Sequence, residues 1–125
     1  MSCAPPSRHT YNCPKKTSPV NPVIHNLFAN IPETPDREVS LTLAQMGHAR
    51  VERIVSNGQA SPPEFWYDQP EDEWVMLIQG TASLQFADGD PVQLNAGDNL
   101  LIPSHVKHRV TATSADAVWL AVHGR

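Results

Sequence analysis

The stretch that decides the fold is YDQPEDEWVMLIQG, which runs from Tyr67 to Gly80. Acidic and amide side chains come first, an apolar run follows, and a glycine ends it. This order is typical of a buried strand that holds polar groups at the mouth of a pocket. A second stretch, GDNLLIPSHVKH from Gly97 to His108, has a similar order and ends in histidines. We predict that the two stretches build one pocket in a small β-barrel.

Length and charge narrow the possible class of protein. The chain has 125 residues, enough for one domain with a single core. Its formal net charge is −4, of which residues 1–25 carry +3, so the remainder carries −7. An acidic body argues against a nucleic-acid surface. No apolar run approaches the ~20 residues that span a bilayer, and no secretory signal is visible. We therefore expect a cytoplasmic protein without nucleic-acid or membrane partners.

The N-terminal part differs in composition from the rest of the chain. Residues 1–24 are rich in Pro, Ser, Thr and Asn and show no hydrophobic period, which favours a disordered or loosely attached extension. Residues 25–125 are predicted to form the barrel domain. Cys3 and Cys13 lie in the extension with His9 between them. A structural zinc site needs four ligands at tighter spacing, so we expect two solvent-exposed thiols.

Alternating apolar and polar residues predict many short strands. In the segment from Glu38 to Leu43, every second residue is apolar. The other expected strands are Ala49–Ser56, Trp74–Gln79, Thr81–Phe86, Pro91–Leu94, Asn99–Ile102, His108–Thr113 and Ala117–Val122. Gly, Asn and Asp separate them, and no segment shows sustained helical periodicity. This pattern indicates an all-β sandwich or barrel.

These residues carry a resemblance to a known family. The chain resembles the small single-domain cupins, which are β-barrels of the double-stranded β-helix or jelly-roll type. Their first motif has two histidines, a glutamate and a strand that ends in glycine. Their second motif has a glycine, usually followed by an aspartate, then a strand that leads to a proline, and then a histidine. The segment Glu73–Gly80 has the glutamate-to-glycine spacing of the first motif, and Gly97-Asp98, Ile102-Pro103 and His108 match the second. The resemblance covers roughly Phe28 to Val122.

The chain departs from the family pattern where the histidine pair is expected. Cupins that bind a metal usually place two histidines just before the glutamate. Here Tyr67 and Gln69 occupy those places, or Trp66 and Asp68 if the gap is one residue longer. The resemblance thus implies a degenerate or remodelled metal site.

The metal that the resemblance implies is one divalent ion, such as Fe, Mn, Ni or Zn. Its predicted ligands are Glu73 and His108, with Gln69 or Asp68 completing the set and Tyr67 as a further alternative. A neutral imidazole suits all of these metals. A carboxylate that faces a barrel interior must be paired or metal-bound. Such a site fits dioxygenase, isomerase or decarboxylase chemistry on a small oxygen-rich substrate.

Two metal-free functions remain open alternatives. Tyr67, Gln69, Glu73 and His108 could recognise a sugar or small acid through hydrogen bonds alone. Alternatively, an acid/base isomerase could use His108 or His105 as its base and Tyr67 as its acid.

Two arginines are candidates for an anionic group of the ligand. Arg53 and Arg109 could each form a charge-assisted, bidentate contact with such a group.

The segment from Trp74 to Ile78 is apolar on both faces of the predicted strand. A strand of this kind suits a sheet that is covered on both sides. Small cupins often dimerise, so we expect a homodimer.

Overall fold

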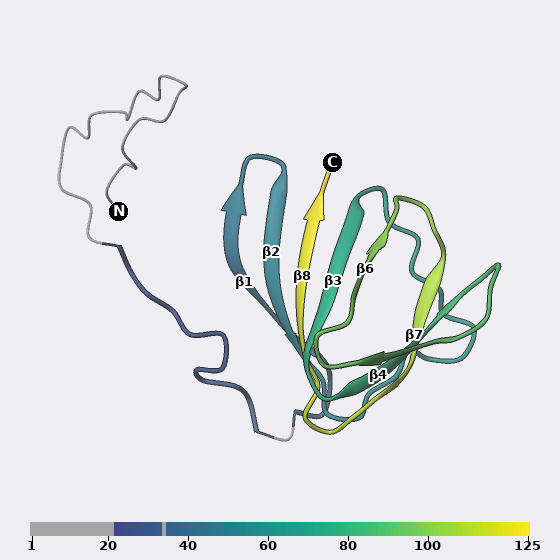
Figure 1. Ribbon diagram of the computed structural model, residues 1–125, viewed down its shortest axis with the longest axis horizontal. Coiled ribbons are helices and arrows are strands. Elements are labelled where there is room, and N and C mark those ends of the chain that lie inside the picture. The colour runs from purple at the N-terminus through teal and green to yellow at the C-terminus, as the bar shows by residue number, and fades with distance from the viewer. Residues whose placement is uncertain (1–21, 34) are drawn as a thin grey trace.

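The computed structural model describes residues 22–33 and 35–125, and their regular structure is entirely β (Figure 1). The strands are β1 (Val39–Met46), β2 (Ala49–Val55), β3 (Asp72–Gln79), β4 (Thr81–Phe86), β5 (Val92–Asn95), β6 (Asn99–Ile102), β7 (His108–Thr113) and β8 (Val118–Gly124). The predicted all-β fold is confirmed. Three predicted strands have the observed bounds, and the others differ by a few residues at their ends.

The strands form two antiparallel sheets. The larger sheet has the order β1-β2-β8-β3-β6, and the smaller has the order β5-β4-β7. Figure 1 shows the larger sheet as a row of neighbouring strands, with β4 and β7 to one side of it. The order of strands in the sheet differs from their order in the chain: β8, at the end of the chain, lies between β2 and β3.

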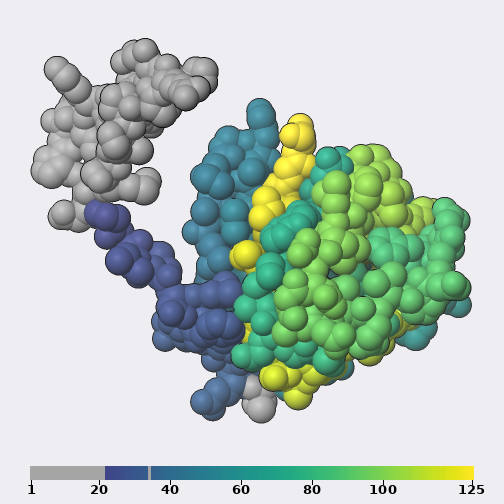
Figure 2. Space-filling model, in the orientation of Figure 1, coloured from purple at the N-terminus to yellow at the C-terminus, as the bar shows by residue number. Residues whose placement is uncertain are grey.

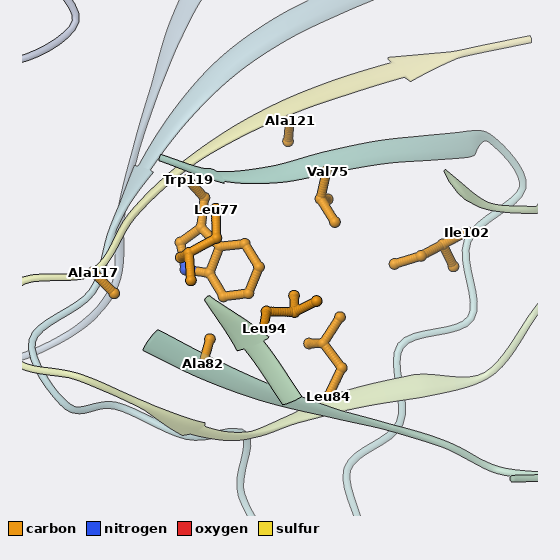
Figure 3. Close-up of a cluster of buried hydrophobic side chains, with 9 residues drawn as sticks. All are labelled: Val75, Leu77, Ala82, Leu84, Leu94, Ile102, Ala117, Trp119 and Ala121. Atoms are coloured by element: carbon orange, nitrogen blue, oxygen red, sulfur yellow. The ribbon is translucent and has the colours of Figure 1, made fainter. Parts of the chain in front are cut away.

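The core lies between the two sheets. Leu77 of β3 is fully buried, and Trp119 of β8 lies beside it in the same cluster. Figure 3 shows both side chains pointing toward Leu84 and Leu94 of the smaller sheet. Residues at two-residue steps along β3 share this inner face, because successive side chains in a strand point to opposite sides. The inner face of β3 therefore begins with Glu73 and ends with Leu77.

The apolar face of β1 points away from the space between the sheets. Ser40 of β1 lines the internal cavity, as does Glu38 just before the strand. Leu41 pairs with Arg53 on the opposite, outer face and is 47% exposed. The predicted alternation is thus present, but in β1 it is the polar side that faces inward.

The chain that precedes β1 is attached to the barrel by Arg53. This side chain is buried on the outer face of β2, and its Nη1 donates hydrogen bonds to the carbonyls of Leu27 (3.0 Å) and Ala29 (2.8 Å). Figure 2 shows the first described residues extending away from the barrel before the chain packs against it. Most of the predicted extension, including Cys3, His9 and Cys13, lies outside the described residues. The boundary at residue 25 stays a prediction.

Within the two described ranges, no helix is long and apolar enough to cross a bilayer. The cytoplasmic location stays a prediction.

Two glycines with positive φ allow a matched test of the turns. A Cβ at Gly80 (φ +88°) would lie 2.3 Å from Ser114 Oγ and 3.0 Å from Ala117 Cα, whereas a Cβ at Gly97 (φ +96°) would meet nothing within 4 Å. Positive φ costs an alanine about 1–2 kcal/mol at either site. We expect Gly80→Ala to lower the free energy of unfolding clearly more than Gly97→Ala, as measured by urea denaturation. Equal losses would show that the turn at Gly80 is not tightly packed.

Candidate functional site

A cavity of about 270 Å³ opens between the two sheets. One part of its wall is polar, and Glu73, His108 and His123 meet there. The rest of the wall is apolar and is formed by Ile54, Val75, Leu84, Ile102, Val110 and Trp119. A concave wall that combines apolar side chains with convergent polar groups is typical of a small-molecule site.

The carboxylate of Glu73 is the centre of the polar part. Glu73 is only 8% exposed. Its Oε1 lies 3.6 Å from His108 Nε2, and its Oε2 lies 3.5 Å from His123 Nε2. A buried carboxylate is costly unless it is partnered, and each oxygen here faces an imidazole from a different strand.

The register of the strands creates this arrangement. Glu73 of β3 pairs directly with His123 of β8 on one side and with Ile102 of β6 on the other. Directly paired residues point to the same face of a sheet. His108 comes from β7 in the opposite sheet, so the carboxylate is approached from both sheets.

The ring of His108 is oriented by the backbone. Its Nδ1 lies 2.8 Å from the carbonyl oxygen of Val106, which can only accept a hydrogen bond. We infer that Nδ1 carries a proton, so that Nε2 of the neutral ring presents a lone pair toward Glu73. Burial by itself lowers the pKa of His108, but Glu73 and the Val106 carbonyl together outweigh it, and the pKa is raised above its usual value.

Tyr67 lies beside His108 because their backbones are paired. The Tyr67 amide donates to the His108 carbonyl (2.7 Å), and the His108 amide donates to the Tyr67 carbonyl (3.1 Å). Their rings are stacked with centroids 5.5 Å apart. Burial, and then the charges of Glu38 and Glu73, raise the pKa of Tyr67, against an opposing hydrogen bond with Ser61. The Tyr67 hydroxyl therefore stays protonated at neutral pH and is able to donate.

A second group of charges continues from His123 along the cavity wall. His123 Nε2 lies 3.9 Å from Glu52 Oε1, and the same oxygen is bound by Arg50 Nε. Arg50 Nη1 also lies 3.9 Å from Glu71 Oε1. Interactions of Arg50 with these carboxylates, led by its hydrogen bond to Glu52, raise the pKa of the guanidinium despite partial desolvation.

Sequence reasoning missed Glu38, Glu52 and His123. A usable signal existed for His123, because Trp119, Ala121 and His123 follow one another at two-residue steps in the last strand. A histidine in line with core residues faces the interior. Glu52 and Glu38 carry no comparable local signal.

The predicted site residues divide into two groups. Glu73, His108, Gln69 and Tyr67 line the cavity. Asp68 does not.

His105 lies outside the cavity wall together with Asp68. Its Nδ1 is 2.7 Å from Asp68 Oδ1, and its side chain is 68% exposed. The His105 amide also donates to the Gln69 carbonyl (2.7 Å). These contacts join the loop after β6 to the loop before β3. The catalytic and metal-binding roles assigned to these residues stay predictions.

The two arginines considered for anion binding also lie away from the cavity wall. Arg53 is bound to backbone carbonyls on the outer face of β2. The guanidinium of Arg109 lies 5.8 Å from the centre of the Trp66 ring, and Arg109 is not a lining residue.

The polar part of the cavity has donor groups of the kinds that a divalent metal requires. Two imidazoles and a carboxylate are suitable donors. However, within residues 22–33 and 35–125, no three His, Cys, Asp or Glu side chains are placed to hold an ion. Each oxygen of Glu73 faces a different ring, at 3.5–3.6 Å. The arrangement as it stands does not fit a metal.

Known proteins share this fold and part of the sequence. A protein of Ralstonia eutropha JMP134 with the provisional name mannose-6-phosphate isomerase is 45% identical, with a TM-score of 0.78 over 82% of this chain and 98% of that one. A cupin superfamily protein of Desulfitobacterium hafniense DCB-2 is 21% identical, with a TM-score of 0.64 over 75% of this chain and 83% of that one.

A curated relative and a family model also match. The uncharacterised protein YdbB of Bacillus subtilis (strain 168) is 26% identical over 87 residues, which are 69% of this chain and 74% of the relative. The family model of the cupin domain matches residues 52–123, which are more than half of the chain and run from within β2 into β8. With its two antiparallel sheets and the spacing of both motifs, the chain belongs to the cupin family.

Proposed function

We propose that the cavity binds a small oxygen-rich molecule and that His108, assisted by Glu73, transfers a proton to and from it. The observation that carries this proposal is the Glu73–His108 pair at 3.6 Å, with the far side of the ring held by the Val106 carbonyl. With Nδ1 bound to the Val106 carbonyl, Nε2 is the nitrogen that accepts the proton, and the Glu73 carboxylate beside Nε2 stabilises the imidazolium that forms.

The neighbouring side chains supply the other parts of an acid/base site. Tyr67 has a protonated hydroxyl beside His108 and would donate to an oxygen of the ligand. His108 would accept a proton from a carbon next to a carbonyl group. This is the chemistry of a sugar isomerase or epimerase. The provisional name of the Ralstonia protein, mannose-6-phosphate isomerase, supports the same reaction class at 45% identity, although that name gives a phosphate ester as the substrate of that protein.

A metal-dependent function remains the second candidate, because two imidazoles and a carboxylate are the right donor types. In that case the side chains of Glu73 and His108 would have to move to surround a divalent ion such as Fe, Mn, Ni or Zn. Of the two predicted partners, Gln69 lines the cavity and Asp68 does not. The experiments below separate the two candidates.

The Glu73–His108 pair is tested by NMR titration of the imidazole C–H signals. We expect the pKa of His108 to lie above about 6.5, the usual value for histidine, and to fall in Glu73→Gln, because the variant lacks the carboxylate charge. A raised folded-state pKa adds stability that is fully present below the unfolded pKa and is lost as pH rises through the folded pKa. Urea denaturation should show that the free energy of unfolding of the wild type falls as pH rises through this range, and that it falls less in Glu73→Gln. An unchanged His108 pKa in the variant would contradict the pairing.

Proton transfer is tested by deuterium incorporation from D₂O into aldoses and ketoses, followed by NMR. We expect exchange at the carbon next to the carbonyl. His108→Gln should slow it by about 10²–10⁴-fold, which is the usual contribution of a general base. Tyr67→Phe, which removes only the hydroxyl, should also slow it. His105→Gln should leave the exchange rate unchanged. If His105→Gln slows exchange and His108→Gln does not, the base is His105.

Metal dependence is tested on protein expressed without a tag. The proposal expects exchange to continue after chelation. Near-stoichiometric iron, manganese, nickel or zinc in the wild type, absent from both Glu73→Ala and His108→Ala, would establish the metal-dependent function in its place.

We also propose that the chain forms a homodimer through the outer face of its larger sheet. Leu41 of β1 and Leu101 of β6 lie on this face and are 47% and 58% exposed. Trp74 and Met76 of β3 are half-buried on the same face. Leu101 is paired with Trp74, so the two side chains lie together on this face, whereas Leu41 lies on the opposite edge strand. Exposed apolar surface is typical of interfaces, and a two-fold dimer would cover the same surface on both copies.

Sedimentation velocity tests the dimer. We expect the wild type to sediment as a dimer, and Leu101→Glu to sediment as a monomer because a charge would be buried at the interface. Val92→Glu is the matched control, since Val92 is an exposed residue of the smaller sheet. A monomeric wild type, or a Leu101→Glu variant that stays dimeric, would exclude this interface.

A further inference from the structure

We infer that the natural ligand of the cavity is an uncharged polyhydroxyl compound and that the cavity discriminates against phosphorylated analogues. This inference rests on the proposed function, because it requires that a small oxygen-rich molecule binds there. The inference adds that the bound molecule is uncharged.

Acidic side chains outnumber permanently cationic ones on the cavity wall. Glu38, Glu52 and Glu73 all line the cavity. Among the described residues that line the cavity, Arg50 is the only arginine or lysine. A ligand with a phosphate group would therefore meet repulsion from several carboxylates at short range, where such forces are weakly screened.

Arg50 is already engaged by carboxylates. Its Nε is bound to Glu52 Oε1, and its Nη1 lies 3.9 Å from Glu71 Oε1. An arginine recognises a phosphate through the paired N–H groups of its planar fork. Here Glu52 holds the Nε side of the guanidinium, so a phosphate that used the other N–H groups would lie next to the carboxylates of Glu52 and Glu71.

The two histidines of the wall are engaged in the same way. His108 and His123 each direct Nε2 toward an oxygen of Glu73. A proton on either ring would be neutralised mainly by that carboxylate. The other two arginines considered for this role, Arg53 and Arg109, do not line the cavity. The described wall thus offers an anion no cationic group that lacks a carboxylate partner.

The chemical groups of the wall suit an uncharged sugar. The carboxylates and the imidazoles form the polar part, and these groups are suited to bind hydroxyl groups. The opposite part is apolar and contains Trp119. A sugar presents hydroxyl groups at its edge and C–H groups on its ring face, so both parts of the wall find partners.

Isothermal titration calorimetry with matched sugars tests the inference on the full-length protein. The probes are D-mannose, D-glucose and D-fructose, each beside its 6-phosphate. For the sugar that binds, we expect the phosphate ester to bind at least roughly tenfold more weakly, in line with the cost of unpaired like charges. Glu52→Gln should narrow this difference in affinity, because it removes one carboxylate from the wall and frees Arg50 Nε from its ion pair. Glu64→Gln makes the same change in net charge at a residue that does not line the cavity, and it should leave the difference unchanged.

Each outcome decides a separate question. A 6-phosphate that binds as tightly as its parent sugar, or more tightly, overturns the inference and leaves the proposed function intact. Equal narrowing in Glu52→Gln and Glu64→Gln overturns the part assigned to the cavity wall, because only net charge then matters. If neither the sugars nor their phosphates bind, the proposed function and the inference both fail.

Discussion

The rest of the site depends on the burial of one carboxylate. Glu73 stands on the inner face of β3 with 8% of its surface exposed. A buried charge is tolerated only with partners, and the partners come from two other strands, His108 on β7 and His123 on β8. Because β7 and β8 belong to opposite sheets, the polar contact joins the sheets at one part of the cavity. In the core, Leu77 and Trp119 of the larger sheet pack with Leu84 and Leu94 of the smaller sheet in one cluster.

A single strand supplies both the site and the core. Along β3, Glu73, Val75 and Leu77 share the inner face, so the wall changes from polar to apolar over two strand steps. The same change occurs along β8, from His123 to Trp119. Since β3 and β8 are paired antiparallel, the polar residues of both strands meet at one end. This is why the cavity has one polar part and one apolar part.

The chain shares the framework of its family but not its usual set of histidines. Where the family places a histidine pair before the glutamate, this chain has Tyr67 and Gln69, and both line the cavity. The second imidazole beside Glu73 is that of His123, about 50 residues later in the chain. The fold and the site chemistry are therefore separate matters, and function has to be argued from the site.

The sequence by itself determined the strands, the turns and the inward direction of Glu73 and His108, because alternation and glycine signals act over a few residues. Only the tertiary structure decided which strands became neighbours. Pairing between β3 and β8 brought His123 to Glu73, and pairing between β2 and β8 brought Glu52 with it. Loop conformation placed Asp68 against His105, outside the cavity wall. These contacts depend on long-range pairing and loop packing, for which a local sequence pattern carries no information.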